Sequence, residues 1–266
     1  MVLSPLVQLF PVSSRNGLKR KVNINNKLRR LFVAKQILEI GTGENRVVIK
    51  RIGNHNRAVI WVGPPLAGKD TQTDRFAELG IPVLQMGPVL RALAEQEPNG
   101  HVHAALSKKE FLDDPTVLWR AKLWVISRLG EPMIHLNGIP RTVPQLEIIK
   151  FLEEHGFDPM VVWFDLPNEV CLNRPCRLGR ETEDTSENRM KRLLIYKEKT
   201  LPMLNELHER FRITQDNGNL LMIDNSIKKK HETAQEILKF LHLPITVKHL
   251  FPEVFLGNGG LETATS

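Results

Sequence analysis

The segment from Ala58 to Leu79 constrains this chain most, because it predicts a strand, a glycine-rich loop and a helix in succession. The apolar residues 58–62 lead into Gly63-Pro64-Pro65-Leu66-Ala67-Gly68-Lys69-Asp70-Thr71. A G-x-x-x-x-G-K-x-T loop wraps an anion, with backbone N–H groups and a helix N-terminus pointing at it. Lys69 adds a point charge for the β- and γ-phosphates. A chance glycine-rich loop is the alternative, but the strand and helix flanks favour a phosphate-binding loop.

Further motifs follow the loop in a fixed order. They are Gly80-Ile81-Pro82 with Gly87, Leu90 and Arg91; Asn137-Gly138-Ile139-Pro140-Arg141-Thr142 with Gln145; Asp165-Leu166-Pro167 with Arg174; and Asn188-Arg189-Met190-Lys191-Arg192. In these segments, over about residues 58–243, the chain resembles the adenylate kinase family of nucleoside monophosphate kinases. Within the motif at 137–145, two positions depart from the family pattern, since Asn137 replaces Asp and Ile139 replaces Phe.

Strand-like and helix-like segments alternate through the same region. Strands are expected at 58–62, 82–85, 132–137, 160–165 and 220–223. This alternation predicts an α/β fold, with a P-loop NTPase-type parallel five-stranded sheet flanked by helices. The resemblance adds a small helical insertion that binds the nucleoside monophosphate (NMP). It also implies a very short lid, because only eight residues separate Arg174 from Glu183.

The chain divides into three expected parts. Residues 1–57 form a basic extension, 58–243 the kinase-like domain and 244–266 a tail outside the core. Residues 28–40 have the mixed apolar and basic pattern of a short amphipathic helix. The pair His101 and His103 is expected in a Gly/Pro-flanked loop, where a solvent-exposed role is favoured over a metal site.

The resemblance implies roles for individual residues. ATP would contact Gly63, Pro65, Ala67, Gly68, Lys69, Asp70 and Thr71. The acceptor would contact Met86, Arg91, Gly138, Arg141 and Gln145. The catalytic set would be Lys69, Arg141, Arg174 and Arg192, with a lid arginine at Arg177 or Arg180. Arginine suits phosphoryl transfer, which requires two phosphate chains held in line and neutralised, because its fork binds phosphate oxygens in pairs.

The acceptor preference stays open at this point. Gln145 either hydrogen-bonds the adenine of the acceptor, as in the family, or completes a capping box with Thr142. The adenine contact is favoured, which points to AMP. Met86 and Pro88, however, replace a threonine and an aspartate of the family pattern. Methionine packs against a ring without hydrogen-bonding it well.

ATP and Mg²⁺ are the implied cofactors, and the metal site is unusual. The family has an aspartate at position 137, which helps hold the Mg²⁺ hydration shell, and a small residue at position 70. Here Asn137 lacks the carboxylate and Asp70 supplies one. Both residues are expected beside the same phosphates. Either the metal-orienting acid has moved to Asp70, since Mg²⁺ prefers one or two carboxylates, or Asp70 only caps the helix.

Charge is concentrated at the N-terminus. Residues 1–57 hold twelve Lys/Arg and two Asp/Glu, a formal +10, and residues 1–38 contain no acid. The segment is compatible with a solvated tail, a mitochondrial or plastid transit peptide, or an arm that binds nucleic acid. Without cleavage of residues 1–40, a cytoplasmic location is expected. No apolar run approaches the ~18 residues that span a membrane, and the chain is expected to be monomeric.

The two cysteines, Cys171 and Cys176, are expected to be reduced thiols.

Taken with the motifs, the resemblance implies a kinase that transfers the γ-phosphate of ATP to AMP or a related NMP. Two alternatives remain. One is a degenerate nucleotide-binding module without turnover, because four site positions diverge. The other is a kinase body tethered to RNA or an assembly by its basic extension.

Overall fold

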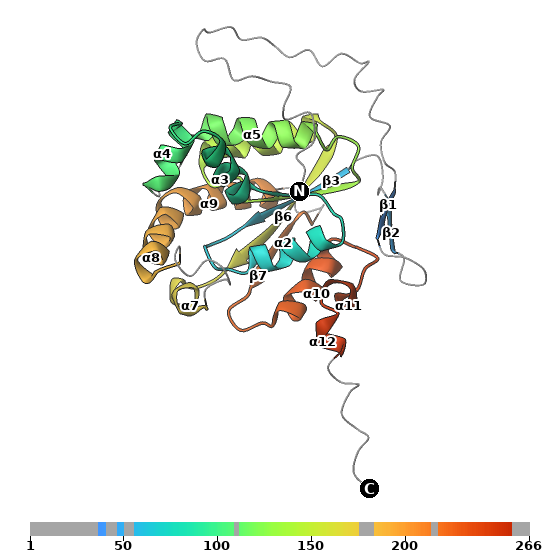
Figure 1. Cartoon of the computed structure of the whole chain (residues 1–266). Helices are drawn as coiled ribbons and strands as arrows, with labels where there is room; N and C mark the ends of the chain where they lie inside the picture. Colours follow the sequence, from blue (N-terminus) through green and yellow to red (C-terminus); the bar gives the residue numbers. More distant parts are fainter. Residues whose placement is uncertain are drawn as a thin grey trace, which may run out of the picture.

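Five parallel strands form the centre of the molecule, in the order β4-β5-β3-β6-β7 (Figure 1). The structure is a computed structural model, and it describes residues 37–40, 47–50, 56–108, 112–175, 184–213 and 218–256. The strands are β3 (Asn56–Val62), β4 (Val83–Gln85), β5 (Met133–Asn137), β6 (Phe157–Asp165) and β7 (Leu220–Asp224). The expected α/β fold with a parallel five-stranded sheet is therefore confirmed.

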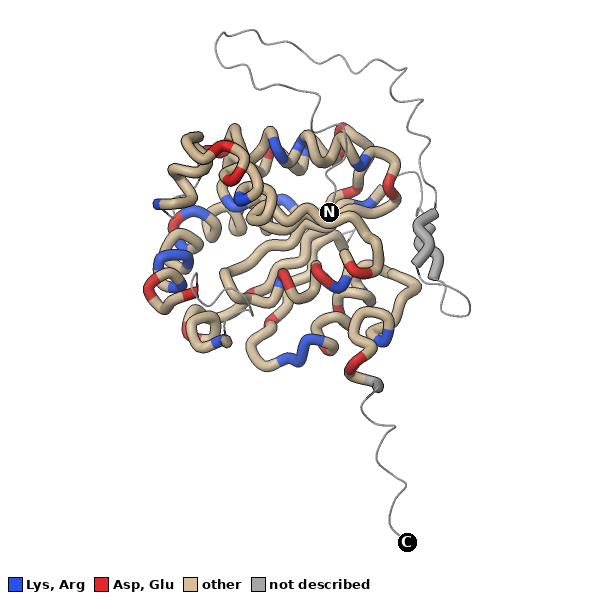
Figure 2. Tube along the Cα trace, in the orientation of Figure 1, with Lys and Arg blue, Asp and Glu red and all other residues tan. Residues whose placement is uncertain are grey.

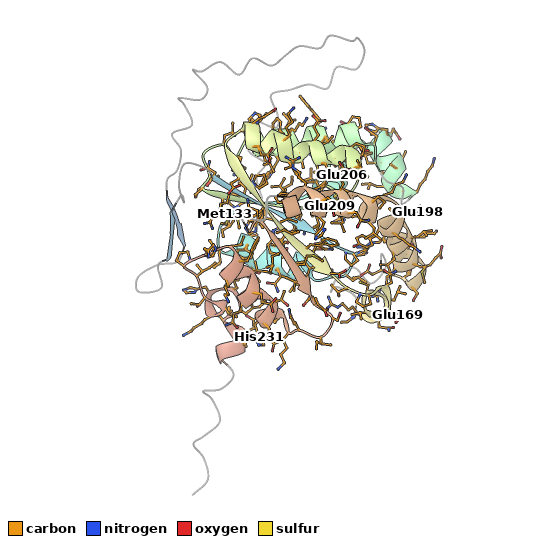
Figure 3. The ribbon with its side chains drawn as sticks, turned by 180° about the vertical axis from the view of Figure 1, so that it is seen from behind. Met133, Glu169, Glu198, Glu206, Glu209 and His231 are labelled. Carbon is orange, nitrogen blue, oxygen red and sulfur yellow. The ribbon has the colours of Figure 1, made fainter. Side chains whose placement is uncertain are left out.

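Helices cover both faces of the sheet. One face carries α3 (Met86–Gln96), α4 (His101–Ser107), α5 (Asp114–Ile126), α6 (Glu147–Glu154) and α9 (Leu201–Ile213). The other carries α2 (Lys69–Glu78), α7 (Asn168–Asn173), α10 (Lys230–Phe240) and α11 (Val247–Leu250). In the view from behind (Figure 3), Glu206 and Glu209 mark α9 on one side, and His231 marks α10 on the other.

Shorter elements complete the fold. A 3₁₀ turn, η3 (Val143–Leu146), precedes α6. Helix α8 (Ser186–Ile195) continues through the π-helical turn η4 (Tyr196–Thr200) into α9. Helix α12 (Glu253–Leu256) ends the described chain. Within the described residues, none of the helices has the length and apolar character needed to span a membrane.

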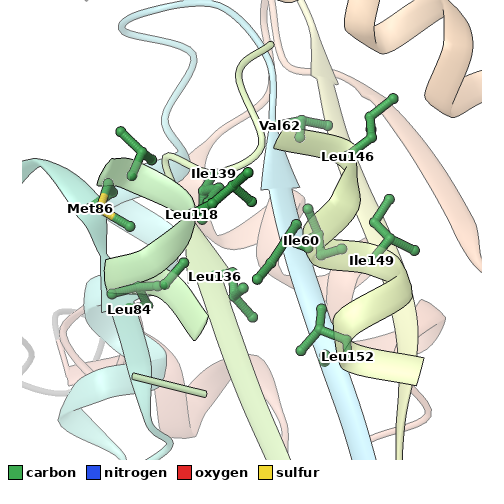
Figure 4. Close-up of a cluster of buried hydrophobic side chains, with 14 of the residues drawn as sticks. Ile60, Val62, Leu84, Met86, Leu118, Leu136, Ile139, Leu146, Ile149 and Leu152 are labelled. Atoms are coloured by element: carbon green, nitrogen blue, oxygen red, sulfur yellow. The ribbon is translucent and has the colours of Figure 1, made fainter. Parts of the chain in front are cut away.

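The central strand β3 shows why both faces are covered. Ala58, Ile60 and Val62 pack into one hydrophobic cluster, and Val59 and Trp61 pack into the other. Because successive side chains of a strand point to opposite faces, a continuous apolar run requires helices on both sides. Figure 4 shows Ile60 and Val62 packed beside Leu146, Ile149 and Leu152.

Charged residues of both signs are interspersed along the helices around this core (Figure 2). The strong positive charge of residues 1–57 falls mostly on residues outside the described part of the chain.

Two expectations from the sequence about local structure are wrong. Residues 37–40 form strand β1 (Ile37–Ile40), which pairs antiparallel with β2 (Val47–Lys50), instead of ending a helix. Residues 28–36, the rest of that expected helix, lie outside the described residues. His101 and His103 lie in α4 instead of a loop, because Val102 between them is fully buried and holds the turn against the core.

The C-terminal segment was also misassigned, since its first part belongs to the core. Ile245, Leu250 and Phe251 are buried in the same cluster as Trp61 and Phe164. Capping of α11 by Thr246 positions these residues, because the Thr246 N–H donates to Nδ1 of His249 at 3.0 Å. The expectation that residues from 244 onward lie outside the core is therefore wrong for residues 245–251.

The buried side chain of His135 is neutral in the folded protein but gains a proton when the chain unfolds at low pH. His135 on β5 is fully buried, with its ring 4.6 Å from the ring of Phe76 and 5.5 Å from that of Trp61. Neither ring nitrogen has a hydrogen-bond partner among the described residues. Burial lowers the pKa of His135 to about 3. The folded state therefore holds a neutral imidazole, whereas the unfolded chain takes up a proton below about pH 6.5.

We expect His135 to make stability fall as the pH drops from 6.5 toward 3. Over this range the unfolded state binds about one more proton than the folded state, which costs about 1.4 kcal/mol per pH unit. Urea unfolding of His135→Leu at pH 6.5, 5.5 and 4.5 should show a shallower dependence than the parent protein. The exposed His103→Leu serves as the control. Parallel curves for the parent and His135→Leu would contradict this assignment.

Candidate active site

The candidate site lies where the parallel strands end. The phosphate loop follows β3, Asn137 ends β5 beside it, and Asn225 directly follows β7. In open α/β sheets, ligands bind outside the carboxyl ends of the strands. The predicted loop and the predicted strand-end residues are thus brought to one edge of the sheet.

The phosphate loop packs closely on the sheet. Gly63 has a φ of 131°, and a Cβ there would lie 2.4 Å from the Phe164 carbonyl oxygen, so only glycine fits. Leu66 adopts a φ of 61°, a left-handed conformation that costs a side-chain-bearing residue roughly 1–2 kcal/mol. Gly68 closes the loop and immediately precedes α2.

Lys69 lies folded over the loop that it is expected to serve. Its Nζ donates to the carbonyl oxygens of Gly63 at 2.8 Å and Pro64 at 2.6 Å. Burial lowers the pKa of Lys69 to about 7; Asp70 opposes the shift, and Arg141 and Arg192 reinforce it. Because these contacts go to backbone carbonyls only, an incoming phosphate is able to take over the ammonium group.

Arg174 and Asn225 together hold the outer side of the loop. Arg174 donates from Nη1 to the Leu66 carbonyl at 3.0 Å and from Nη2 to the Asn225 carbonyl. The Asn225 amide donates to the Ala67 carbonyl at 2.8 Å and accepts from the Thr233 hydroxyl at 2.7 Å. Asn225 was not among the residues predicted from the sequence, although a polar residue directly after a parallel strand is a usable signal.

The acceptor side is built around Gly138 and Arg141. Gly138 has a φ of 92°, and a Cβ there would lie 3.2 Å from the Met86 Cβ and 3.3 Å from Nη2 of Arg141. Met86 is 2% exposed and packs into the hydrophobic core (Figure 4), so it offers almost no surface to a base. The guanidinium of Arg91 lies near Gly87, on the first turns of α3.

Gln145 is engaged inside the protein. Its Oε1 accepts from the Arg141 backbone N–H at 2.8 Å, and its Nε2 donates to Oδ1 of Asp114 at 2.8 Å. The Thr142 hydroxyl donates to the same carboxylate oxygen at 2.6 Å. The Thr142 side chain makes no cap hydrogen bond to the turn that follows it, so the capping-box alternative is not realised. A base that hydrogen-bonds Gln145 would have to replace Asp114, a partner that the sequence pattern does not predict.

Arg192 and Arg189 both bind Asp184. Arg192 pairs with Asp184 at 2.7 Å, where the Asp184 side chain is 2% exposed. Arg189 donates from Nε to the Asp184 carbonyl at 3.1 Å and from Nη1 to the carbonyls of Leu172 at 2.9 Å and Arg174 at 2.6 Å. The expected lid arginines, Arg177 and Arg180, lie outside the described residues, as does Cys176.

Cys171 on α7 borders this region as a buried free thiol. Burial raises its pKa, although Arg174 and Lys69 oppose the shift. A protonated, buried thiol is a poor nucleophile, so Cys171 serves packing instead of catalysis.

Positive charge converges on the space in front of the phosphate loop. Arg141 is an exposed residue, yet the pKa of its guanidinium is lowered, first by partial loss of hydration and then by Arg192. Arg141 and Arg192 also lower the pKa of Lys69. Three cations that repel one another in the free protein form a site for a polyanion, which would relieve this repulsion.

Asp70 and Asn137 are in direct contact. The Asn137 Nδ2 donates to Oδ1 of Asp70 at 2.7 Å and to Oγ1 of Thr73 at 3.3 Å. In the described part of the chain, no group of three His, Cys, Asp or Glu residues is placed to bind a metal ion. A Mg²⁺ ion here would thus depend on Asp70 together with water and nucleotide phosphates, a donor set that suits this ion.

Comparisons with known proteins agree with this geometry. A family model described as an AAA domain matches residues 62–193. The chain is 35% identical to an adenylate kinase of Thermus thermophilus over 156 residues, which covers 56% of this chain and 81% of that protein. It is 31% identical to the adenylate kinase of Synechococcus sp. (strain JA-2-3B'a(2-13)) over 192 residues, which covers 69% and 94% of the two chains.

Proposed function

Since this chain belongs to the adenylate kinase family, we propose that it transfers the γ-phosphate of ATP to AMP or a related nucleoside monophosphate. The observation that carries the proposal is the convergence of Lys69, Arg141 and Arg192 in front of the phosphate loop. Phosphoryl transfer between nucleotides depends on positioning and charge neutralisation, and this arrangement offers both.

The residues divide the work by position. In the proposed complex, loop N–H groups and the N-terminus of α2 bind the phosphates of ATP, and Lys69 leaves the Gly63 and Pro64 carbonyls to contact them. Arg141 and Arg91 bind the phosphate of the acceptor. Arg174 and Arg192 neutralise the charge between the two nucleotides, where the transferred group passes.

A Mg²⁺ ion would be held by Asp70 together with water and nucleotide phosphates, and it would neutralise phosphate charge there. In this proposal, AMP is the preferred acceptor because the family motif around Gln145 is retained. Met86, buried and apolar, adds no hydrogen bond that selects among bases.

The test is an acceptor screen with ATP and Mg²⁺. AMP, GMP, CMP and UMP are compared by direct chromatographic measurement of the nucleoside diphosphate formed, and a reaction without acceptor corrects for ATP hydrolysis. We expect the highest kcat/KM with AMP. Turnover with only one of the other monophosphates would show that this monophosphate, and not AMP, is the acceptor. ATP binding without turnover on any acceptor would reject the kinase and favour a degenerate nucleotide-binding module.

A further inference from the structure

A carboxylate stands among the cations of the candidate site. Asp70 is the second residue of α2, directly after Lys69. Among the described carboxylates it is the one that raises the pKa of both Lys69 and Arg141. A polyphosphate bound at this helix end would meet the negative charge at short range, and the two would repel each other.

Asn137 fixes the direction of this carboxylate. An ionised carboxylate only accepts hydrogen bonds, so the amide must turn its NH₂ group toward Asp70, at 2.7 Å. Asn137 is 5% exposed and ends β5, whose neighbours are β3 and β4. A rigid strand end therefore holds Asp70 at the mouth of the phosphate loop.

Stabilisation of the helix end does not account for this arrangement. An acid in the first turn of α2 is modestly favourable, because it interacts with the helix dipole. The same N–H groups and dipole, however, attract the phosphates. If Asp70 only stabilised the helix, it would compete with the nucleotide for this positive field and weaken binding. A cation between the two negative groups removes the conflict.

We propose that the start of α2 and the end of β5 share one divalent-cation site, in which Asp70, oriented by Asn137, binds the cation of the nucleotide or one of its waters. The inference rests on the proposed function and deepens it. Mg²⁺ is commonly held by one or two carboxylates together with waters and substrate phosphates. Here Asp70 supplies a carboxylate, and the Asn137 amide across from it keeps that carboxylate in place.

The experiment measures the affinity of ATP by calorimetry, with Mg²⁺ and with EDTA, and takes the ratio of the two Kd values within each variant. In the parent protein we expect ATP to bind at least about tenfold more weakly in EDTA, because Asp70 repels it. Asp70→Asn keeps the shape and a hydrogen-bonding side chain but removes the charge. We expect it to lower the ratio about tenfold, mainly by improving metal-free binding.

The double variant Asp70→Asn with Asn137→Asp returns one carboxylate to the shared site, and we expect it to restore the ratio. Asp74→Asn is the matched control, because Asp74 lies one turn further along α2 and pairs with Gln85 at 2.5 Å. Its ratio should equal that of the parent. If Asp70→Asn does not fold, Asp70→Gly supports the same comparison.

An unchanged ratio in the Asp70 variant overturns the proposal, and so does a double variant that fails to recover the metal dependence. Because each ratio is internal to one variant, a general loss of ATP affinity cancels. A parent protein that binds no ATP even with Mg²⁺ would instead reject the proposed function, which separates the two failures.

Discussion

Replacement of Lys69 by methionine is expected to lower kcat by a factor on the order of 10³ or more, while the fold stays intact. Methionine fills a similar volume but cannot neutralise charge on the transferred phosphate. The contacts that the variant loses in the free protein are two hydrogen bonds to loop carbonyls, from Nζ to Gly63 and Pro64. Removing a partly desolvated charge should leave the melting temperature unchanged or higher.

The measurement is steady-state kinetics with saturating ATP, Mg²⁺ and AMP, together with thermal unfolding. Lys150→Met is the control, because Lys150 is an exposed lysine on α6 that pairs only loosely, at 3.8 Å, with Glu154. Near-normal turnover of the Lys69 variant would show that the loop does not act on the transferred phosphate.

The Arg141→Lys variant is expected to lose about 10²-fold in kcat/KM for the acceptor, although the side-chain charge is retained. A lysine places one compact charge where the guanidinium offers a planar fork to two phosphate oxygens. The backbone N–H of residue 141 still donates to Gln145, so the local structure should survive. The variant therefore separates the effect of the guanidinium geometry from the effect of the positive charge on binding of the acceptor phosphate.

Arg210→Lys provides the control for this change, since Arg210 on α9 pairs with Glu153 on α6 at 2.9 Å and makes no hydrogen bond or ion pair with a described site residue. Kinetics with AMP varied at fixed ATP would resolve the effect. An Arg141→Lys enzyme with parental kcat/KM would mean that Arg141 does not bind the acceptor phosphate.

The sheet and the phosphate loop were predictable because their signals are local and strong. Residues 58–62 form an unbroken apolar run directly before the glycine loop, and β3 is indeed buried on both faces. The contact between Asp70 and Asn137 followed the same logic, since one residue begins a helix after β3 and the other ends the adjacent parallel strand.

The missed features depend on contacts between distant segments. Asn225 reaches the Ala67 carbonyl across 158 residues of chain, and Gln145 finds Asp114 across 31. The burial of Val102 holds helix α4 against the core. A segment of seven residues is too short for a helical hydrophobic period to show this in the sequence. Sequence patterns locate strands, loops and their ends, whereas the choice of partner for an amide or carboxylate depends on tertiary packing.

The single guanidinium of Arg189 fastens the chain on both sides of residues 176–183, through the carbonyls of Arg174 and Asp184. Residues 174 and 184, which flank that segment in the sequence, are thus tied to one side chain. The free-energy cost of bringing the ends of a flexible segment together rises slowly with its length, by about 0.6 kcal/mol for each doubling. Because Arg189 fixes both flanking residues, we expect a change in the number of residues between 174 and 184 to leave the sheet undisturbed. This segment is also the natural position at which to graft a foreign domain.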